Sequence, residues 1–391
     1  MFRDTISQQD KELVFFTRDL VTQHIVSRAL EYDALGNDRF DGSALDILAE
    51  HNLLAPNILP EYGGRGASHL VTAMILEEIG AGCAGVAAAV AANIQSIAPL
   101  LAAGTEEQLR HYLPLLTAPQ TSLGAVAMVE NGVNLDVLLP TEKVAIYGSS
   151  LQAERSAGGD VINGRKDYVV NAVTAKFIST LVEYPDGHDQ ASSGFQLMVI
   201  PLDTPGIILG PLGRKLGLRY CSTAEIEFKA LKAEPQYMIG RPGSGLEIFK
   251  ECMYKTVPLI GAVCVGVARA AYQHALEVSK ERRMSGHPVF EESAVGHSLV
   301  SMASKLNAAR LSVHHACWMI DTGQDHTLAS PQAKIVASQA AQDITSGSME
   351  IVGNQAYVSG NSAEKYLRDA KMLSIMDGSE QFHRCLLASQ L

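Results

Sequence analysis

The chain has 391 residues, of which 47% are hydrophobic, 19% are charged and 6% are aromatic, and its formal net charge is -11. This length suits two or three packed domains, and the apolar fraction is too high for a disordered chain. The acidic balance, with no block of basic residues, argues against nucleic acid or an anionic membrane as the main partner.

The first 118 residues predict a helical domain. The N-terminus mixes charged and polar residues at once and has no signal-peptide apolar core. Apolar residues recur at helical spacing after Ser7, and further helices are expected at 42–52, 70–79, 84–103 and 105–116. The most apolar stretch is alanine-rich and is interrupted by Asn93 and Pro99, so we expect no membrane span and a cytoplasmic protein.

Residues 119–235 predict a small antiparallel β domain. Short runs of Val, Ile, Phe and Leu alternate there with turn signals. Asn163-Gly164 is the strongest tight-turn signal and predicts a hairpin that joins strands at 159–162 and 165–171. Further strands are expected at 195–201 and 223–229.

Residues 236–391 predict long helices. The ranges 259–283 and 293–321 each carry an apolar face, and a third helix is expected to begin at Ser330-Pro331, with serine as the N-cap. Such lengths, joined by short polar loops, indicate a four-helix bundle. The predicted fold class is therefore α+β, mainly α: an N-terminal helical domain, a middle antiparallel β domain and a C-terminal four-helix bundle.

The six cysteines lie far apart in the sequence, without CxxC pairs or zinc-ligand spacing. We therefore expect buried thiols in a reducing compartment and no metal site.

Four segments in chain order resemble the flavin-dependent acyl-CoA dehydrogenases. They are the turn at 60–64, the segment at 105–114, the strand at 163–171 and the sequence Tyr-Leu-Arg-Asp-Ala-Lys at 366–371. The resemblance implies the same three-domain fold, a homotetramer built as a pair of dimers, and FAD-dependent α,β-dehydrogenation of an acyl thioester. In that reaction a carboxylate removes the proton next to the carbonyl, and the flavin accepts hydride from the next carbon.

Asp377 falls where the family carries its catalytic glutamate. The local sequence is Met376-Asp377-Gly378-Ser379, so the carboxylate is one methylene shorter than in the family. The resemblance implies that Asp377 is the base for a bulky, cyclic or otherwise different substrate. It also places Met376 and Gly378 beside the substrate and Ser379 beside the cofactor. The alternative is a loop aspartate that makes an Asx-type hydrogen bond before Gly378.

Several family positions that face the flavin ring are replaced. Val129 and Glu130 stand in the family's flavin-facing stretch, and Leu135 replaces its serine on the substrate side. Tyr168 and Val170 replace the family's tryptophan and threonine. Tyr168 can still cover one face of the ring, whereas Val170 offers no hydroxyl. Each lost side-chain hydrogen bond is worth about 0.5–1.5 kcal/mol.

The positions for the rest of the cofactor and for CoA are also changed. Arg282 matches the family's pyrophosphate-binding arginine, and a guanidinium suits phosphate oxygens. Gly353 retains one glycine of a family segment in which Glu350 adds a negative charge near the expected phosphate. Tyr254 and Val257 replace the charged residues that commonly hold the CoA arm, which makes a carrier-protein-bound acyl group an alternative to CoA.

The sequence therefore predicts a divergent FAD-dependent acyl-thioester dehydrogenase, with an electron-transfer flavoprotein among the acceptors that the resemblance allows. Two alternatives stay open. One is a non-redox lyase or hydratase on the same fold, with Asp377 as a proton shuttle. The other is a non-catalytic subunit that supports an active paralogue in a mixed tetramer.

Overall fold

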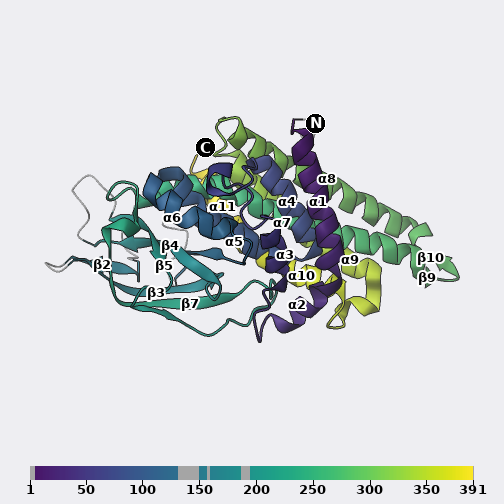
Figure 1. Cartoon of the computed structure of the whole chain (residues 1–391). Coiled ribbons are helices and arrows are strands. Elements are labelled where there is room, and N and C mark those ends of the chain that lie inside the picture. The colour runs from purple at the N-terminus through teal and green to yellow at the C-terminus, as the bar shows by residue number, and fades with distance from the viewer. Residues whose placement is uncertain (1–4, 131–148, 156–158, 186–193, 391) are drawn as a thin grey trace.

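The computed structural model describes residues 5–130, 149–155, 159–185 and 194–390, and it places a β sheet beside a body of helices (Figure 1). The predicted fold class is confirmed in its helix–sheet–helix order. The N-terminal helices are α1 (Gln8–His24), α2 (Ala29–Leu35), α3 (Ser43–Glu50), α4 (His69–Gly82), α5 (Ala84–Ala103) and α6 (Glu106–Thr117).

Side-chain caps explain where two of these helices begin. Ser7 and Asp10 form a capping box at α1, and Thr105 and Gln108 form another at α6. Thr105 is therefore the N-cap of α6 rather than its first helical residue. The prediction for α5 agrees with the structure at both ends, although the helix contains Pro99.

The sheet has the strand order β6-β7-β3-β1-β4-β5-β8, and β2 pairs with both β3 and β4. Most neighbours are antiparallel, but β1 and β2 each run parallel to β4, so the prediction of a purely antiparallel sheet is wrong for these pairs. The strands are β1 (Leu123–Ala127), β2 (Gln152–Glu154), β3 (Val161–Val170), β4 (Ala175–Glu183), β5 (Phe195–Pro201), β6 (Ile207–Leu209), β7 (Thr223–Lys232) and β8 (Met238–Ile239).

The hairpin predicted at Asn163-Gly164 is wrong, because β3 runs without a break through both residues. Gly164 has φ +136°, and a Cβ there would lie 1.9 Å from the carbonyl oxygen of Ser150. Asn163 accepts a hydrogen bond from the backbone N–H of Ala230 at 2.8 Å. The dipeptide therefore serves close approach of neighbouring backbone segments rather than chain reversal.

The C-terminal helices pack around α7, which contacts α4, α5, α8 and α9. Helix α7 begins well before the predicted 259 and continues through Pro258. Ser330 and Pro331 lie in the first turn of α9, and the N-cap is Leu328 rather than the predicted Ser330. The elements are α7 (Gly245–Glu281), β9 (Arg283–Met284), β10 (His287–Pro288), α8 (Ser293–Asp321), α9 (Ala329–Val352), α10 (Ser362–Leu373) and α11 (Glu380–Ala388).

Helices α5 and α7 are long and apolar enough to cross a membrane by length and composition alone. However, 72% and 89% of their apolar windows are buried inside the protein, as expected for core helices. All six cysteines are free thiols. Five are buried, whereas Cys385 is exposed, so the expectation of six buried thiols is wrong at this position.

Candidate active site

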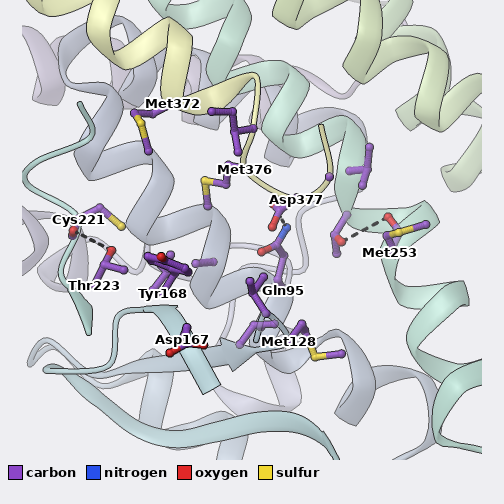
Figure 2. Close-up of a pocket in the computed structure, with 18 of the residues that line it drawn as sticks. Gln95, Met128, Asp167, Tyr168, Cys221, Thr223, Met253, Met372, Met376 and Asp377 are labelled. Atoms are coloured by element: carbon purple, nitrogen blue, oxygen red, sulfur yellow. Dashed lines mark hydrogen bonds between the residues drawn. The ribbon is translucent and has the colours of Figure 1, made fainter. Parts of the chain in front are cut away.

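A cavity of about 860 Å³ lies between the sheet, α5, α7 and the loop that joins α10 to α11 (Figure 2). This volume is typical of a small-molecule or cofactor site. The cavity brings together nine of the residues singled out in the sequence: Val129, Glu130, Tyr168, Val170, Val257, Met376, Asp377, Gly378 and Ser379.

The α10–α11 loop presents Asp377 to this cavity in an unusual backbone conformation. Asp377 has φ +56° and Gly378 has φ +93°, both in the left-handed region. A Cβ at Gly378 would lie 2.5 Å from the Phe382 ring, so glycine is required there. Ser379 then caps α11, because its hydroxyl accepts a hydrogen bond from the backbone N–H of Phe382 at 3.2 Å. The loop is thus held in one shape, with Asp377 at its tip.

The Asp377 carboxylate receives a hydrogen bond from α5. Gln95 Nε2 donates to Asp377 Oδ2 at 2.5 Å. Burial raises the pKa of Asp377 above its usual value, while the Gln95 hydrogen bond and the nearby Lys334 partly oppose that rise. The site therefore holds a carboxyl group that is more basic than a free aspartate.

Two buried nitrogen-bearing side chains, Lys334 and His383, donate hydrogen bonds to backbone carbonyls in the loop and at the end of α10. Lys334 Nζ donates to the Leu373 carbonyl at 2.7 Å, and burial lowers the pKa of this lysine. His383 Nε2 lies 3.0 Å from the Asp377 carbonyl, which can only accept, so Nε2 carries the proton. Burial, with Lys334 as the second cause, lowers the pKa of His383 to about 4. His383 is therefore a neutral donor that holds the Asp377 backbone.

On the sheet side, Tyr168 has an exposed ring at the cavity, whereas the Glu130 carboxylate is occupied by hydrogen bonds to its neighbours. Tyr168 has φ +54°, and its side chain is 67% exposed beside the cavity. The Glu130 carboxylate is already engaged, because it accepts hydrogen bonds from Lys166, from the Ser149 hydroxyl and from the backbone N–H of Ser150. Glu130 therefore organises the cavity wall. Leu135 lies outside the described residues.

Arg282, Gly353 and Glu350 do not line this cavity. Arg282 Nη1 donates to the Ile351 carbonyl at 2.6 Å, and a Cβ at Gly353 would lie 2.9 Å from the same nitrogen. The exposed Glu350 precedes Ile351 at the end of α9. This corner adjoins β9 and β10, at the opposite end of the molecule from the sheet (Figure 1).

Of the two positions predicted for the CoA arm, Val257 lines the cavity but Tyr254 does not. The Tyr254 hydroxyl instead accepts a hydrogen bond from Gln390 Nε2 at 3.0 Å.

The segment at 366–371 supports a wall of the cavity rather than the reacting groups. Asp369 is fully buried and accepts hydrogen bonds from the Leu218 backbone N–H and from Lys365 Nζ, both at 2.6 Å. Arg368 binds Asp33 through both terminal nitrogens. Leu218 lines the cavity with φ +51°, so this buried network fixes a strained part of the wall.

Gln95 and Lys334 are site residues that the sequence reasoning missed. A weak signal for Gln95 exists, because Ala92, Gln95 and Pro99 share one face of α5 and all three line the cavity. The other amide of this stretch of α5 is used elsewhere, since Asn93 binds the backbone of Leu54 and Gly124.

Three family models match successive parts of the chain: the N-terminal domain of acyl-CoA dehydrogenase at 7–119, the middle domain at 126–231 and the C-terminal domain at 243–391. A similar curated protein is the cyclohex-1-ene-1-carbonyl-CoA dehydrogenase of Syntrophus aciditrophicus (strain SB), which is 28% identical over 393 residues, covering 100% of this chain and 92% of that protein.

Two solved structures are similar over almost the whole chain. Butyryl-CoA dehydrogenase from Megasphaera elsdenii has a TM-score of 0.90 and 24% identity, with 98% of each chain covered. The prolyl acyl carrier protein oxidase AnaB has a TM-score of 0.88 and 25% identity, with 98% of this chain and 99% of that chain covered. The helix–sheet–helix fold with this cavity is that of a flavoprotein oxidoreductase. The chain belongs to the acyl-CoA dehydrogenase family.

Proposed function

We propose that the protein is an FAD-dependent acyl-thioester dehydrogenase in which Asp377 removes the α-proton of the substrate. The observation that carries this proposal is the Asp377 carboxyl group, held in the cavity by Gln95, with a pKa raised by burial. A raised pKa makes a carboxylate a stronger base, and a fixed orientation favours proton transfer over random approach.

The residues of the sheet side fit a flavin ring. The cavity volume of about 860 Å³ suits a planar ring next to an acyl group, and the exposed Tyr168 ring can cover one face. Val129 and Val170 supply apolar surface there. FAD, when bound, supplies the acceptor for the hydride of the β-carbon. Arg282 ends α7 directly before β9, which lies at the end of the molecule away from the main sheet (Figure 1), and this supports a role towards the cofactor of a neighbouring subunit.

The helix side of the cavity supports an uncharged acyl group. This side is lined by the apolar or polarisable side chains of Phe249, Cys252, Met253 and Phe382. The Thr256 hydroxyl is engaged by the Cys252 carbonyl at 3.0 Å. We therefore propose a short, branched or cyclic acyl chain, in keeping with the ring-bearing thioester in the name of the Syntrophus relative.

The thioester is proposed to carry a pantetheine arm, which CoA and acyl carrier proteins share. AnaB, named as a carrier-protein oxidase, supports the carrier, whereas the Syntrophus relative supports CoA. We further propose a cytoplasmic homotetramer that passes electrons to an electron-transfer flavoprotein, as the family resemblance implies.

Purified protein is expected to show the yellow absorbance bands of bound flavin and to oxidise uncharged acyl thioesters with an artificial electron acceptor. Protein without flavin bands that takes up no added FAD would overturn the proposal. Conversion of a thioester without any acceptor would instead favour the lyase or hydratase. Flavin binding with no conversion would favour the non-catalytic subunit.

Dicarboxylic acyl thioesters are expected to be oxidised at least about 100-fold less efficiently than uncharged ones of equal length. The lining residues that the structure describes include only two cations, Arg214 and Lys215, and both belong to the segment before β7 on the sheet side. A substrate carboxylate on the helix side would be buried without a partner, at a cost of several kcal/mol. Comparison of kcat/KM for butanoyl and succinyl pantetheine thioesters checks this, and equal values would contradict it.

The acid limb of the pH profile of kcat/KM is expected to lie above the usual range of an aspartate. Asp377 acts as the carboxylate, so activity is present above its pKa and is lost as the pH falls through it, and burial raises that pKa. A pH-rate profile of the holoenzyme measures the limb. An acid limb at the pKa of a free aspartate would contradict the buried environment of Asp377.

A further inference from the structure

One amide reaches across the cavity to the proposed base. In Figure 2 the Gln95 side chain points to Asp377, with Tyr168, Cys221 and Thr223 on one side of the pair and Met253 on the other. The contact of 2.5 Å joins helix α5 to a loop that lies 282 positions later in the chain. The Gln95–Asp377 pair therefore stands between the sheet side and the helix side of the cavity.

The amide is the only hydrogen-bond donor that the described residues direct at the Asp377 carboxylate, and it binds Oδ2. The backbone is held separately, because His383 Nε2 donates to the Asp377 carbonyl. The loop conformation, with positive φ at Asp377 and Gly378, fixes where the short side chain starts. The direction of the carboxylate is thus decided by Gln95, and Oδ1 has no donor among the described residues.

We infer that Gln95 is the positioning residue of this shortened base. It holds Asp377 Oδ2 and leaves Oδ1 to receive the α-proton. Its side chain also occupies the space between α5 and the loop into which a longer acid would extend. This inference rests on the proposed function. If Gln95 positions Asp377, the two residues act as a pair, and the Gln95 side chain determines that an aspartate rather than a glutamate suits position 377. A glutamate at 377 would extend the carboxylate by about 1.5 Å towards an amide that already contacts the shorter acid.

The test measures proton removal without oxidation. The probe is the pantetheine thioester of 3,3-dimethylbutanoic acid, whose β-carbon bears no hydrogen, so that only exchange of its α-protons with deuterated water can be followed by mass spectrometry. Asp377 takes a proton from the α-carbon, and the resulting enolate takes a deuteron back, so no oxidant is needed.

Gln95→Leu is expected to slow this exchange by about 10–100-fold and to move its acid limb to higher pH, because the donor that stabilises the carboxylate is lost. Asp377→Glu is expected to slow exchange as well, despite restoring the family's residue. The double variant Gln95→Ala with Asp377→Glu is expected to exchange at least about tenfold faster than Asp377→Glu alone, since the paired sites are coupled.

Gln339→Leu is the matched control. Gln339 Nε2 donates to Glu380 Oε1 at 2.7 Å, an amide–carboxylate bond of the same kind whose glutamine does not line the cavity. Its exchange rate and pH profile are expected to match those of the wild type. Flavin absorbance and circular dichroism of each variant report whether it is folded.

Two results overturn the inference alone: Gln95→Leu with an unchanged rate and acid limb, or a double variant no faster than Asp377→Glu. The proposed function stands in both cases, provided that the wild type exchanges the probe and oxidises uncharged thioesters. A wild type that binds FAD but does neither overturns the proposed function, and the inference falls with it.

Discussion

Asp377→Asn is expected to lower the rate of thioester oxidation by about 10²–10⁴-fold, the usual contribution of a general base, while the protein still binds FAD. The amide cannot accept the α-proton, but it has nearly the shape of the carboxylate. Asparagine also tolerates the left-handed backbone found at this position, and its oxygen can still accept the Gln95 hydrogen bond. Steady-state oxidation and the flavin spectrum measure the two properties separately.

The same substitution is expected to raise thermal stability at neutral pH. Burial raises the pKa of Asp377 in the folded protein, so the folded state holds the charged form less well than the unfolded state does. For an acid with a raised pKa, ionisation destabilises the folded state. This destabilisation is absent below the pKa of the unfolded state and grows as the pH rises towards the pKa of the folded state. The melting temperatures of the variant and the wild type should therefore converge in acid and diverge near neutrality.

The exposed Asp343, which pairs with Lys305 at the surface, is the control for that measurement. Asp343→Asn should change neither the oxidation rate nor the pH dependence of the melting temperature, because exposed ion pairs contribute little. An Asp377→Asn variant that oxidises thioesters at the wild-type rate would remove Asp377 from the mechanism.

Local sequence patterns predicted elements well where the local chain decides the structure. The alanine-rich run of α5 and the strand β5 were predicted at both ends, because apolar composition and flanking turns suffice for them. The hairpin prediction at Asn163-Gly164 is wrong for the opposite reason. Its turn propensity is local, but the approach of Ser150 to within 1.9 Å of a Cβ at Gly164 is a tertiary contact that no local pattern reports.

The candidate site divides in the same way. Asp377 was found from the motif around it, whereas its partner Gln95 lies 282 positions away and has no motif. Lys334 was missed because a lysine in a helix is usually exposed, yet here it is fully buried and donates to the Leu373 carbonyl. A motif therefore located the base, while only the folded chain shows what sets its direction and its pKa.

Lys365→Met is expected to lower the free energy of unfolding by about 3–5 kcal/mol, the range for breaking a buried ion pair from one side. Lys365 and Asp369 are 4% and 0% exposed, and their charged atoms lie 2.6 Å apart. Without the ammonium, the Asp369 carboxylate stays buried with the Leu218 N–H as its remaining hydrogen-bond donor among the described residues. Urea unfolding followed by circular dichroism measures the loss.

Lys365→Met is also expected to weaken the binding of FAD. Asp369 holds Leu218, which has positive φ and lines the cavity, so a weakened Asp369 loosens the wall beside the proposed flavin. FAD should then dissociate more readily from Lys365→Met than from the wild type at temperatures where both are folded. Lys305→Met breaks an exposed pair with Asp343, and it should cost at most about 1 kcal/mol and leave FAD affinity unchanged. If both lysine variants behave alike, the buried Lys365–Asp369 ion pair does not support the cavity.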